Sequence, residues 1–180
     1  FGIYQTANSS GDSSTSFTND GDASVVVDNE AVASAGSASA SGSLTYGVYQ
    51  TVGGADSATA TLANGADATL GVDLTNKATG TNSAGASSGL TFGIYQGANS
   101  GDTSSASFTN DGDASVSLDN EAAASAGSAG ASSILTYGIS QAVSGTNSAL
   151  ATIENGTAGA IDVGLVNSAI GTSGAGAAGS

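Results

Sequence analysis

The side chains in this sequence that could do chemistry are carboxylates. The chain of 180 residues has fifteen Asp and Glu, a single basic residue, Lys77, and neither His nor Cys. Without His or Cys, the usual nucleophile–base pairs cannot be built. Carboxylates alone could share acid–base work or bind a hard cation such as Ca²⁺. The candidates for such a cation site are two Asn-Asp-Gly-Asp turns, which contain Asp20 with Asp22 and Asp111 with Asp113.

These turns do not predict an enzyme. No insertion between the repeats would build a pocket, and the glycine-rich segments lack the strand–loop–helix context of a phosphate site. The two Asp-rich turns are far apart in the repeat, and the equivalent turns between them keep only Asp67 or no Asp. We therefore expect no catalysis and no required cofactor. Calcium binding at Asp20, Asp22, Asp111 and Asp113 is an alternative to the simpler interpretation that these carboxylates are solvated and keep the protein soluble.

The charge balance excludes several classes of partner. A net charge of −14 leaves nothing to neutralise the phosphates of nucleic acid. It equally disfavours an anionic membrane surface. No apolar run reaches the roughly 18 residues that a membrane-spanning helix needs. We expect neither nucleic-acid binding nor membrane insertion.

A side-chain amide recurs about every 23 residues and marks the predicted strands. The positions two and four residues before each amide are apolar in every case, and the position just before it is mixed. Alternation with period 2 indicates β-strands whose amide faces inward between apolar neighbours. On this pattern Tyr4, Tyr49 and Tyr95 face outward, whereas Phe1 faces the core. The amides are Gln5, Asn29, Gln50, Asn76, Gln96, Asn120, Gln141 and Asn167.

A longer repeat contains these amides. The motif Phe1-Gly2-Ile3-Tyr4-Gln5 returns, with variation, at Tyr46, Phe92 and Tyr137. It divides a single domain, residues 1–180, into the units 1–45, 46–91, 92–136 and 137–180, with a higher-order period of 91. Because each unit has two amides, we predict an all-β solenoid of about eight rungs of ~23 residues, with two strands per rung.

Stacked rungs give the amides a structural role. A buried amide is costly unless it is hydrogen-bonded, and amides at one position of successive rungs can donate to one neighbour and accept from the other. Such a ladder also sets the register of the strands. We therefore predict that the eight amides form one ladder along the rod.

Two segments carry a resemblance to a known family. Residues 141–149, Gln-Ala-Val-Ser-Gly-Thr-Asn-Ser-Ala, and the stretch from Asn76 through residues 80–84, Gly-Thr-Asn-Ser-Ala, resemble the Gln…Gly-x-Asn-x-Ala pattern of curlin repeats, the subunits of bacterial curli. The chain is also similar to repeat passengers of large Gram-negative surface exoproteins. The resemblance implies an extracellular or cell-surface, solenoidal protein that forms fibres or adheres.

The ends of the repeat suggest how it would act. The sequence starts without Met at the first residue of a repeat, and Ser180 is two residues short of the next Phe-Gly-Ile-Tyr-Gln. With no recognisable cap at either end, we expect copies of the chain to stack head to tail into a secreted, curli-like filament of a biofilm matrix. Other fibres or cell-surface components are further possible partners. The alternatives are the stalk of an adhesin or autotransporter passenger and, less favoured, an ice- or calcium-binding solenoid.

Overall fold

The computed structural model describes all 180 residues and contains thirteen β-strands and no helix. The strands form three parallel sheets, called sheets A, B and C. Sheet A contains β1 (Ile3–Asn8), β4 (Ser37–Gly54), β7 (Ser83–Ser100), β10 (Ser128–Ser144) and β13 (Gly174–Gly179). Sheet B contains β2 (Ser13–Asn19), β5 (Ser57–Asn64), β8 (Thr103–Asn110) and β11 (Ser148–Asn155). Sheet C contains β3 (Asp22–Val32), β6 (Thr69–Gly80), β9 (Asp113–Ala124) and β12 (Ala160–Gly171).

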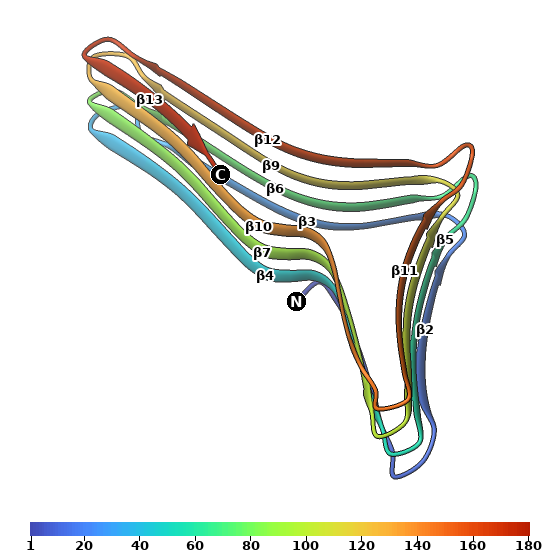
Figure 1. Ribbon diagram of the computed structural model, residues 1–180. Helices are drawn as coiled ribbons and strands as arrows, with labels where there is room; N and C mark the ends of the chain where they lie inside the picture. The colour runs from blue at the N-terminus through green and yellow to red at the C-terminus, as the bar shows by residue number, and fades with distance from the viewer.

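The chain winds through the three sheets in turn, so that each strand pairs with the strand one whole unit later. Gln5 lies opposite Gln50, and Asn29 lies opposite Asn76. One full circuit, here called a coil, therefore takes a whole unit of about 45 residues, and the coils numbered 1 to 4 correspond to the four units. Figure 1 shows the coils as layers that follow one another from blue to red.

This register corrects the predicted rung. The all-β class and the parallel stacking of repeats are confirmed, but the pairing gives neither eight rungs of ~23 residues nor two strands per rung. The two amides of a unit lie on different sheets of the same coil, because Gln50 is in β4 of sheet A and Asn76 is in β6 of sheet C. The two halves of a unit resemble each other because strands of two different sheets share the same alternation of inward residues. The two halves are not successive layers of the solenoid.

Each coil has a three-sided body with two flattened extensions (Figure 1). The long strands of sheet A supply both, because their first halves pack against the ends of the strands in sheet C and their second halves pack against sheet B. The first extension, here called the Ala arm, is filled by columns of alanine such as Ala38, Ala78 and Ala84. Small side chains let the two sheets approach closely there, so the core is thin.

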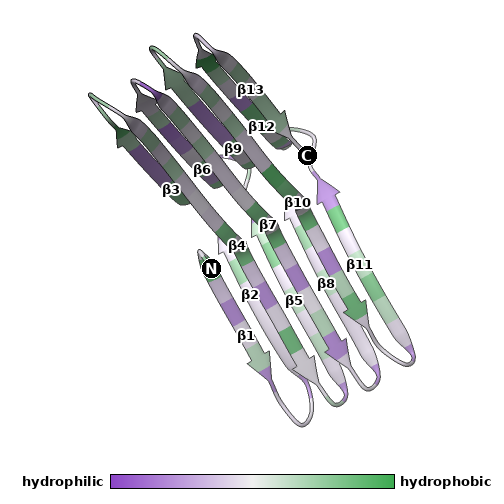
Figure 2. Ribbon diagram, turned by 90° about the vertical axis from the view of Figure 1, so that its left-hand side faces the viewer, coloured by the Kyte–Doolittle hydropathy of each residue, from purple (hydrophilic) through white to green (hydrophobic).

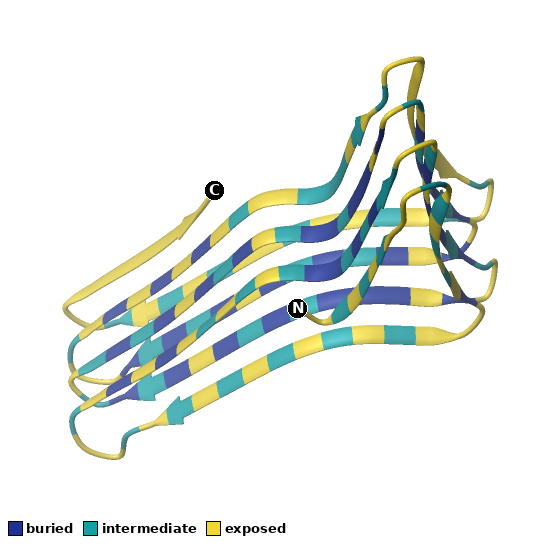
Figure 3. Cartoon of the chain, turned by 90° about the horizontal axis from the view of Figure 1, so that it is seen from below, coloured by how far each residue is buried: buried dark blue, intermediate teal, exposed yellow.

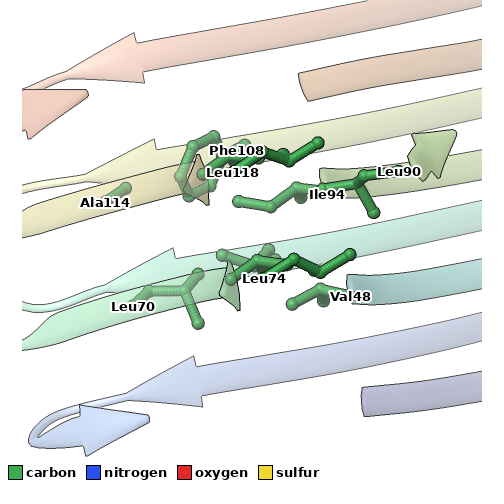
Figure 4. Close-up of a cluster of buried hydrophobic side chains, with 11 residues drawn as sticks. Val48, Leu70, Leu74, Leu90, Ile94, Phe108, Ala114 and Leu118 are labelled. Carbon is green, nitrogen blue, oxygen red and sulfur yellow. The ribbon is translucent and has the colours of Figure 1, made fainter. Parts of the chain in front are cut away.

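Large apolar side chains fill the three-sided body. Phe108 comes from sheet B, Leu74 and Leu118 from sheet C, and Ile94 from sheet A (Figure 4). Leu62 of sheet B belongs to the same cluster. Residues of one column lie in equivalent places in successive coils, and bands of like hydropathy fall in line across neighbouring strands (Figure 2). The core is therefore a continuous ladder of like residues along the rod.

The long strands bend where the recurring motif places glycine. A β-carbon on Gly47 would lie 2.5 Å from the Val72 methyls and 2.6 Å from the Gly93 carbonyl oxygen, so no larger residue fits. The equivalent positions in the other coils, Gly2, Gly93 and Gly138, face Val25, Val116 and Val163 in the same way. Glycine thus lets sheet A approach sheet C at the bend. No helix in this structure could span a membrane.

Candidate functional site

The glutamines form a ladder between the body and the extension shared by sheets A and B. Gln50 donates through Nε2 to Oε1 of Gln5 at 2.7 Å, Gln96 donates to Gln50 at 3.0 Å, and Gln141 donates to Gln96 at 2.8 Å. Each Nε2 also donates to a backbone carbonyl of sheet B, as Gln50 does to Thr61 at 3.1 Å. Gln50 and Gln96 are 0 % exposed. The ladder therefore ties sheet A to sheet B as well as coil to coil.

The predicted asparagines form a second ladder at the base of the Ala arm. Asn29 donates through Nδ2 to Oδ1 of Asn76 at 2.9 Å, Asn76 to Asn120 at 3.0 Å, and Asn120 to Asn167 at 3.0 Å. Hydroxyls of sheet A accept the second proton in the last two coils, from Asn120 to Ser88 and from Asn167 to Ser133. All eight predicted amides point inward, but in two ladders of four rather than one of eight.

A third ladder was not predicted. Asn19 donates to Asn64, Asn64 to Asn110 and Asn110 to Asn155, at 2.8, 2.8 and 2.7 Å, at the corner where sheet B turns into sheet C. These asparagines also donate to turn carbonyls, such as Asn64 to Ala68 at 3.2 Å. From the sequence alone, Asn19 and Asn110 are expected only as part of the Asn-Asp-Gly-Asp turns. The signal that could have found them is their spacing of one unit, the same spacing as the glutamines.

The ladders have a direction. In the glutamine ladder every amide donates toward coil 1, whereas in both asparagine ladders every amide donates toward coil 4. At the coil 1 end, Gln5 consequently keeps an unused ladder donor, and Asn29 and Asn19 keep unused acceptors. At the coil 4 end, Gln141 keeps an acceptor, and Asn167 and Asn155 keep donors. The two ends of the rod are thus complementary at all three ladders.

Aromatic rings form two adjoining columns on the outer face of sheet A, at its bend. Phe1, Tyr46, Phe92 and Tyr137 stack in one column, with centroids 4.9–5.2 Å apart. Tyr4, Tyr49 and Tyr95 stack in the other, with centroids 5.2–5.3 Å apart, and the columns touch edge to face. The tyrosines face outward as predicted, but the inward position predicted for Phe1 is wrong: its side chain is 65 % exposed. Gly2 takes the inward place, because only glycine fits against Val25.

The candidate calcium ligands are not brought together. Asp22 and Asp113 lie in one column but two coils apart, with Thr69 between them. No group of three or more acidic side chains in the structure could hold a metal ion. The Asp residues of the two Asp-rich turns are therefore not gathered into one cluster.

Carboxylates on the outer face of sheet C alternate with other residues along each column. Asp28, Thr75, Asp119 and Val166 follow one another in one column. In another, Lys77 lies between Glu30 and Glu121 and makes an ion pair of 3.1 Å with Glu121. The hydrogen bond and the charge of Glu121 raise the pKa of Lys77 above its ordinary value. Since like charges directly opposite each other repel, the alternation keeps carboxylates from facing one another on these two columns.

The end coils leave core positions open. Ile153 in coil 4 is 49 % exposed, whereas Phe108 and Leu62 in the same column are 0 % exposed. Figure 3 shows the same contrast, with buried segments in the middle strands and exposed ones at the ends. The ends are also stepped: β13 covers only the first half of β10, and β1 covers only the second half of β4.

Comparison with protein-family models, with curated proteins and with solved structures finds no match to this chain. The likeness to curlin repeats therefore rests on the sequence motifs alone.

Proposed function

We propose that this protein is the subunit of an extracellular bacterial filament that grows by head-to-tail stacking of coil 4 of one copy onto coil 1 of the next. The observation that carries the proposal is the complementarity of the two ends. Gln141 would accept from Gln5 of the next copy, while Asn167 and Asn155 would donate to its Asn29 and Asn19. Each ladder would then continue with the direction that it has inside the chain.

The stepped ends support the same junction. The β1 strand of the next copy would lie on the uncovered half of β10, and its β2 and β3 would lie on β11 and β12. The first half of its β4 would lie on β13. Phe1 would stack on Tyr137, continuing the aromatic column with the spacing of about 5 Å seen within the chain. Exposed core residues of coil 4, such as Ile153, would be covered by the junction.

The charges of the coils favour this polarity. Coil 1 carries Asp12, Asp20, Asp22, Asp28 and Glu30, and coil 4 carries only Glu154 and Asp162. Stacking coil 4 on coil 1 places a weakly acidic coil against a strongly acidic one, as inside the chain. Joining two coil 1 ends would instead bring two strongly acidic coils together. A contact of this head-to-tail kind does not close on itself and produces a filament.

The filament is proposed to be extracellular and structural, on the strength of the curlin resemblance. The complementary ladder ends and the exposed core positions of the end coils support a role in assembly. If further coils of one chain continued the same columns, the protein would be the stalk of an adhesin or autotransporter passenger. That alternative predicts that the isolated chain stays a single rod.

The test uses one column of sheet B at the junction. Thr18, Ala63, Thr109 and Glu154 lie in register on its outer face. In the proposed junction, Glu154 faces Thr18 of the next copy, about 4.8 Å away. Thr18→Glu places two carboxylates opposite each other only at the junction, because its neighbour within the chain is Ala63. Thr18→Lys offers Glu154 an ion pair instead.

We expect the purified chain to form filaments with an axial repeat of ~4.8 Å by fibre diffraction. Elongation, followed by light scattering and electron microscopy, should be slowed at least ~10-fold by Thr18→Glu and not by Thr18→Lys, since 10-fold is about 1.4 kcal/mol. Ala63→Glu is the matched control, with the same charge change on the same column but away from the junction. Persistently single rods, or equal effects of Thr18→Glu and Ala63→Glu, would refute head-to-tail stacking.

A further inference from the structure

Sheet A is the uncharged side of the rod. None of the fifteen acidic residues, and not Lys77, lies in its five strands. The turns at the tip of the Ala arm, residues 33–36, 81–82 and 125–127, are uncharged as well. The outer face of sheet C, in contrast, carries Asp22, Asp28, Glu30, Asp73, Asp113, Asp119, Glu121 and Asp162. Of the remaining acidic residues, Asp12, Asp56 and Asp102 lie in the turns that join sheet A to sheet B, at the end away from the Ala arm. The others lie on sheet B or in the turns between sheets B and C, namely Asp20, Asp67, Asp111 and Glu154.

This distribution limits how two copies can meet side by side. Contact through sheet C, or through sheet B with its acidic turns, would bring carboxylates of the two copies together. No basic patch can offset that repulsion, because Lys77 is the one basic residue and is already paired with Glu121. Only the outer face of sheet A, at its bend and along the Ala arm, can meet its counterpart on another copy without placing carboxylates in the contact.

The outer face of sheet A suits such a contact. It carries the two aromatic columns, in which Tyr4 and Tyr137 are 53 % and 50 % exposed. Contiguous exposed aromatic side chains of this kind are typical of interaction surfaces. Beside the columns, shallow grooves run over the small residues of the Ala arm, among them Ser39, Gly85 and Gly130.

Glycines on this face have no role within the chain. A β-carbon on Gly89, Gly130 or Gly176 would meet nothing within 4 Å, and none of the three has a positive φ. Glycine inside a strand is destabilising relative to alanine. Such a glycine often marks a site where another backbone approaches closely. These glycines leave the outer face of sheet A without side chains that would hold a second backbone away.

We infer that two copies pair laterally through the outer faces of sheet A, with their aromatic columns and Ala arms in contact. Sheet C of each copy then faces solvent on opposite sides of the pair. Since each rod has one uncharged side, association stops at two rods rather than continuing into a bundle. The inference is independent of head-to-tail stacking, because it uses a side of the rod and not its ends.

The test counts chains per length of rod. Mass-per-length measurement by scanning transmission electron microscopy should give two chains for every four coils of the filament. Gly130→Asp adds a carboxylate to the outer face of sheet A at a position with open space, and should halve the mass per length. Gly164→Asp is the control: this glycine of sheet C also has nothing within 4 Å of a β-carbon, and the substitution should leave two chains.

The pairing can be tested even if filaments do not form. Sedimentation equilibrium should then show dimers for the unmodified chain and for Gly164→Asp, and monomers for Gly130→Asp. A single chain per four coils of filament would overturn lateral pairing, and so would a monomeric unmodified chain in the absence of filaments. Either result is expected if the natural occupant of this face is a neutral polymer and not a second copy. Unchanged pairing in Gly130→Asp would overturn it too.

Discussion

At the scale of single residues, the inward amides set the register of the coils. Gln50 makes three hydrogen bonds in a fully buried position, two with the neighbouring glutamines and one with a carbonyl of sheet B. A strand that slipped by one residue would turn its amide toward solvent and leave its neighbours unpaired. Alanine at the same position would still pack in the core. A one-residue shift of the strand would then cost less free energy, because no buried hydrogen bonds would be lost.

Replacement of one amide should therefore destabilise the fold more than loss of an outer ring. Gln50→Leu leaves buried groups of Gln5, Gln96 and Thr61 without their partner, and unsatisfied groups cost about 1–3 kcal/mol each. We expect a loss of about 3 kcal/mol or more in the free energy of unfolding by denaturant titration. Tyr49→Ser, which copies Ser140 of coil 4, should cost about 1–2 kcal/mol. Equal losses would contradict the ladder.

Tyr95 gives the fold a dependence on alkaline pH. Burial, and then the neighbouring Tyr49 and Tyr46, raise the pKa of Tyr95 above its ordinary value of 10.0. The folded state therefore favours the protonated phenol, so this contribution to stability is complete below pH 10 and is lost as pH rises through the raised pKa. Titration of tyrosinate absorbance should show a component above 10 that Tyr95→Phe removes. A titration unchanged by Tyr95→Phe would contradict this environment.

At the scale of elements, the long strands of sheet A serve both extensions because they bend at an inward glycine. At the bend, Tyr46 and Tyr49 lie on the outer face of sheet A, while Gly47 and Val48 between them face inward. Strict alternation is therefore interrupted at this point. The interruption places both aromatic columns on one face, where strict alternation would have buried one of them.

Two alanine substitutions separate a glycine that the fold requires from one that it does not. Gly47→Ala places a methyl group 2.5 Å from the Val72 side chain, and overpacking of this kind costs about 1–3 kcal/mol. Gly130→Ala meets nothing within 4 Å and should stabilise the single rod by about 0.5–1 kcal/mol. Thermal and denaturant unfolding of non-assembled protein would measure both. Changes of the same sign would contradict the assigned facing of these glycines.

At the scale of the whole molecule, the proposed assembly would work against a net charge of −14 on each copy. In the proposed junction, coil 1 of one copy would approach coil 4 of another against the repulsion between their carboxylates. Salt screens this repulsion, because the Debye length falls from about 30 Å at 0.01 M salt to about 10 Å at 0.1 M. We expect filament elongation to accelerate as NaCl is raised over this range. Thr18→Lys should show a weaker dependence on salt than the unmodified chain. Elongation that slows with added salt would contradict a junction limited by repulsion.

The sequence by itself determined the strand content, the inward amides and the four units. Alternation with period 2 indicates which residues lie on each face of a strand, and a fixed repeat period indicates repeated structural units. These features therefore follow from local sequence pattern. The eight amides, the outward tyrosines and the inward Leu62 and Phe108 could all be found in this way.

Only the tertiary structure decided which repeat stacks on which. The half-units resemble each other because two sheets of one coil need the same alternation, and local pattern cannot tell a neighbour within the coil from a neighbour in the next. Pairing of Gln5 with Gln50, rather than with Asn29, is a long-range choice that depends on how the chain closes around its core. The same closure brings Gly47 against Val72, and that close contact turns the aromatic residue of the motif outward.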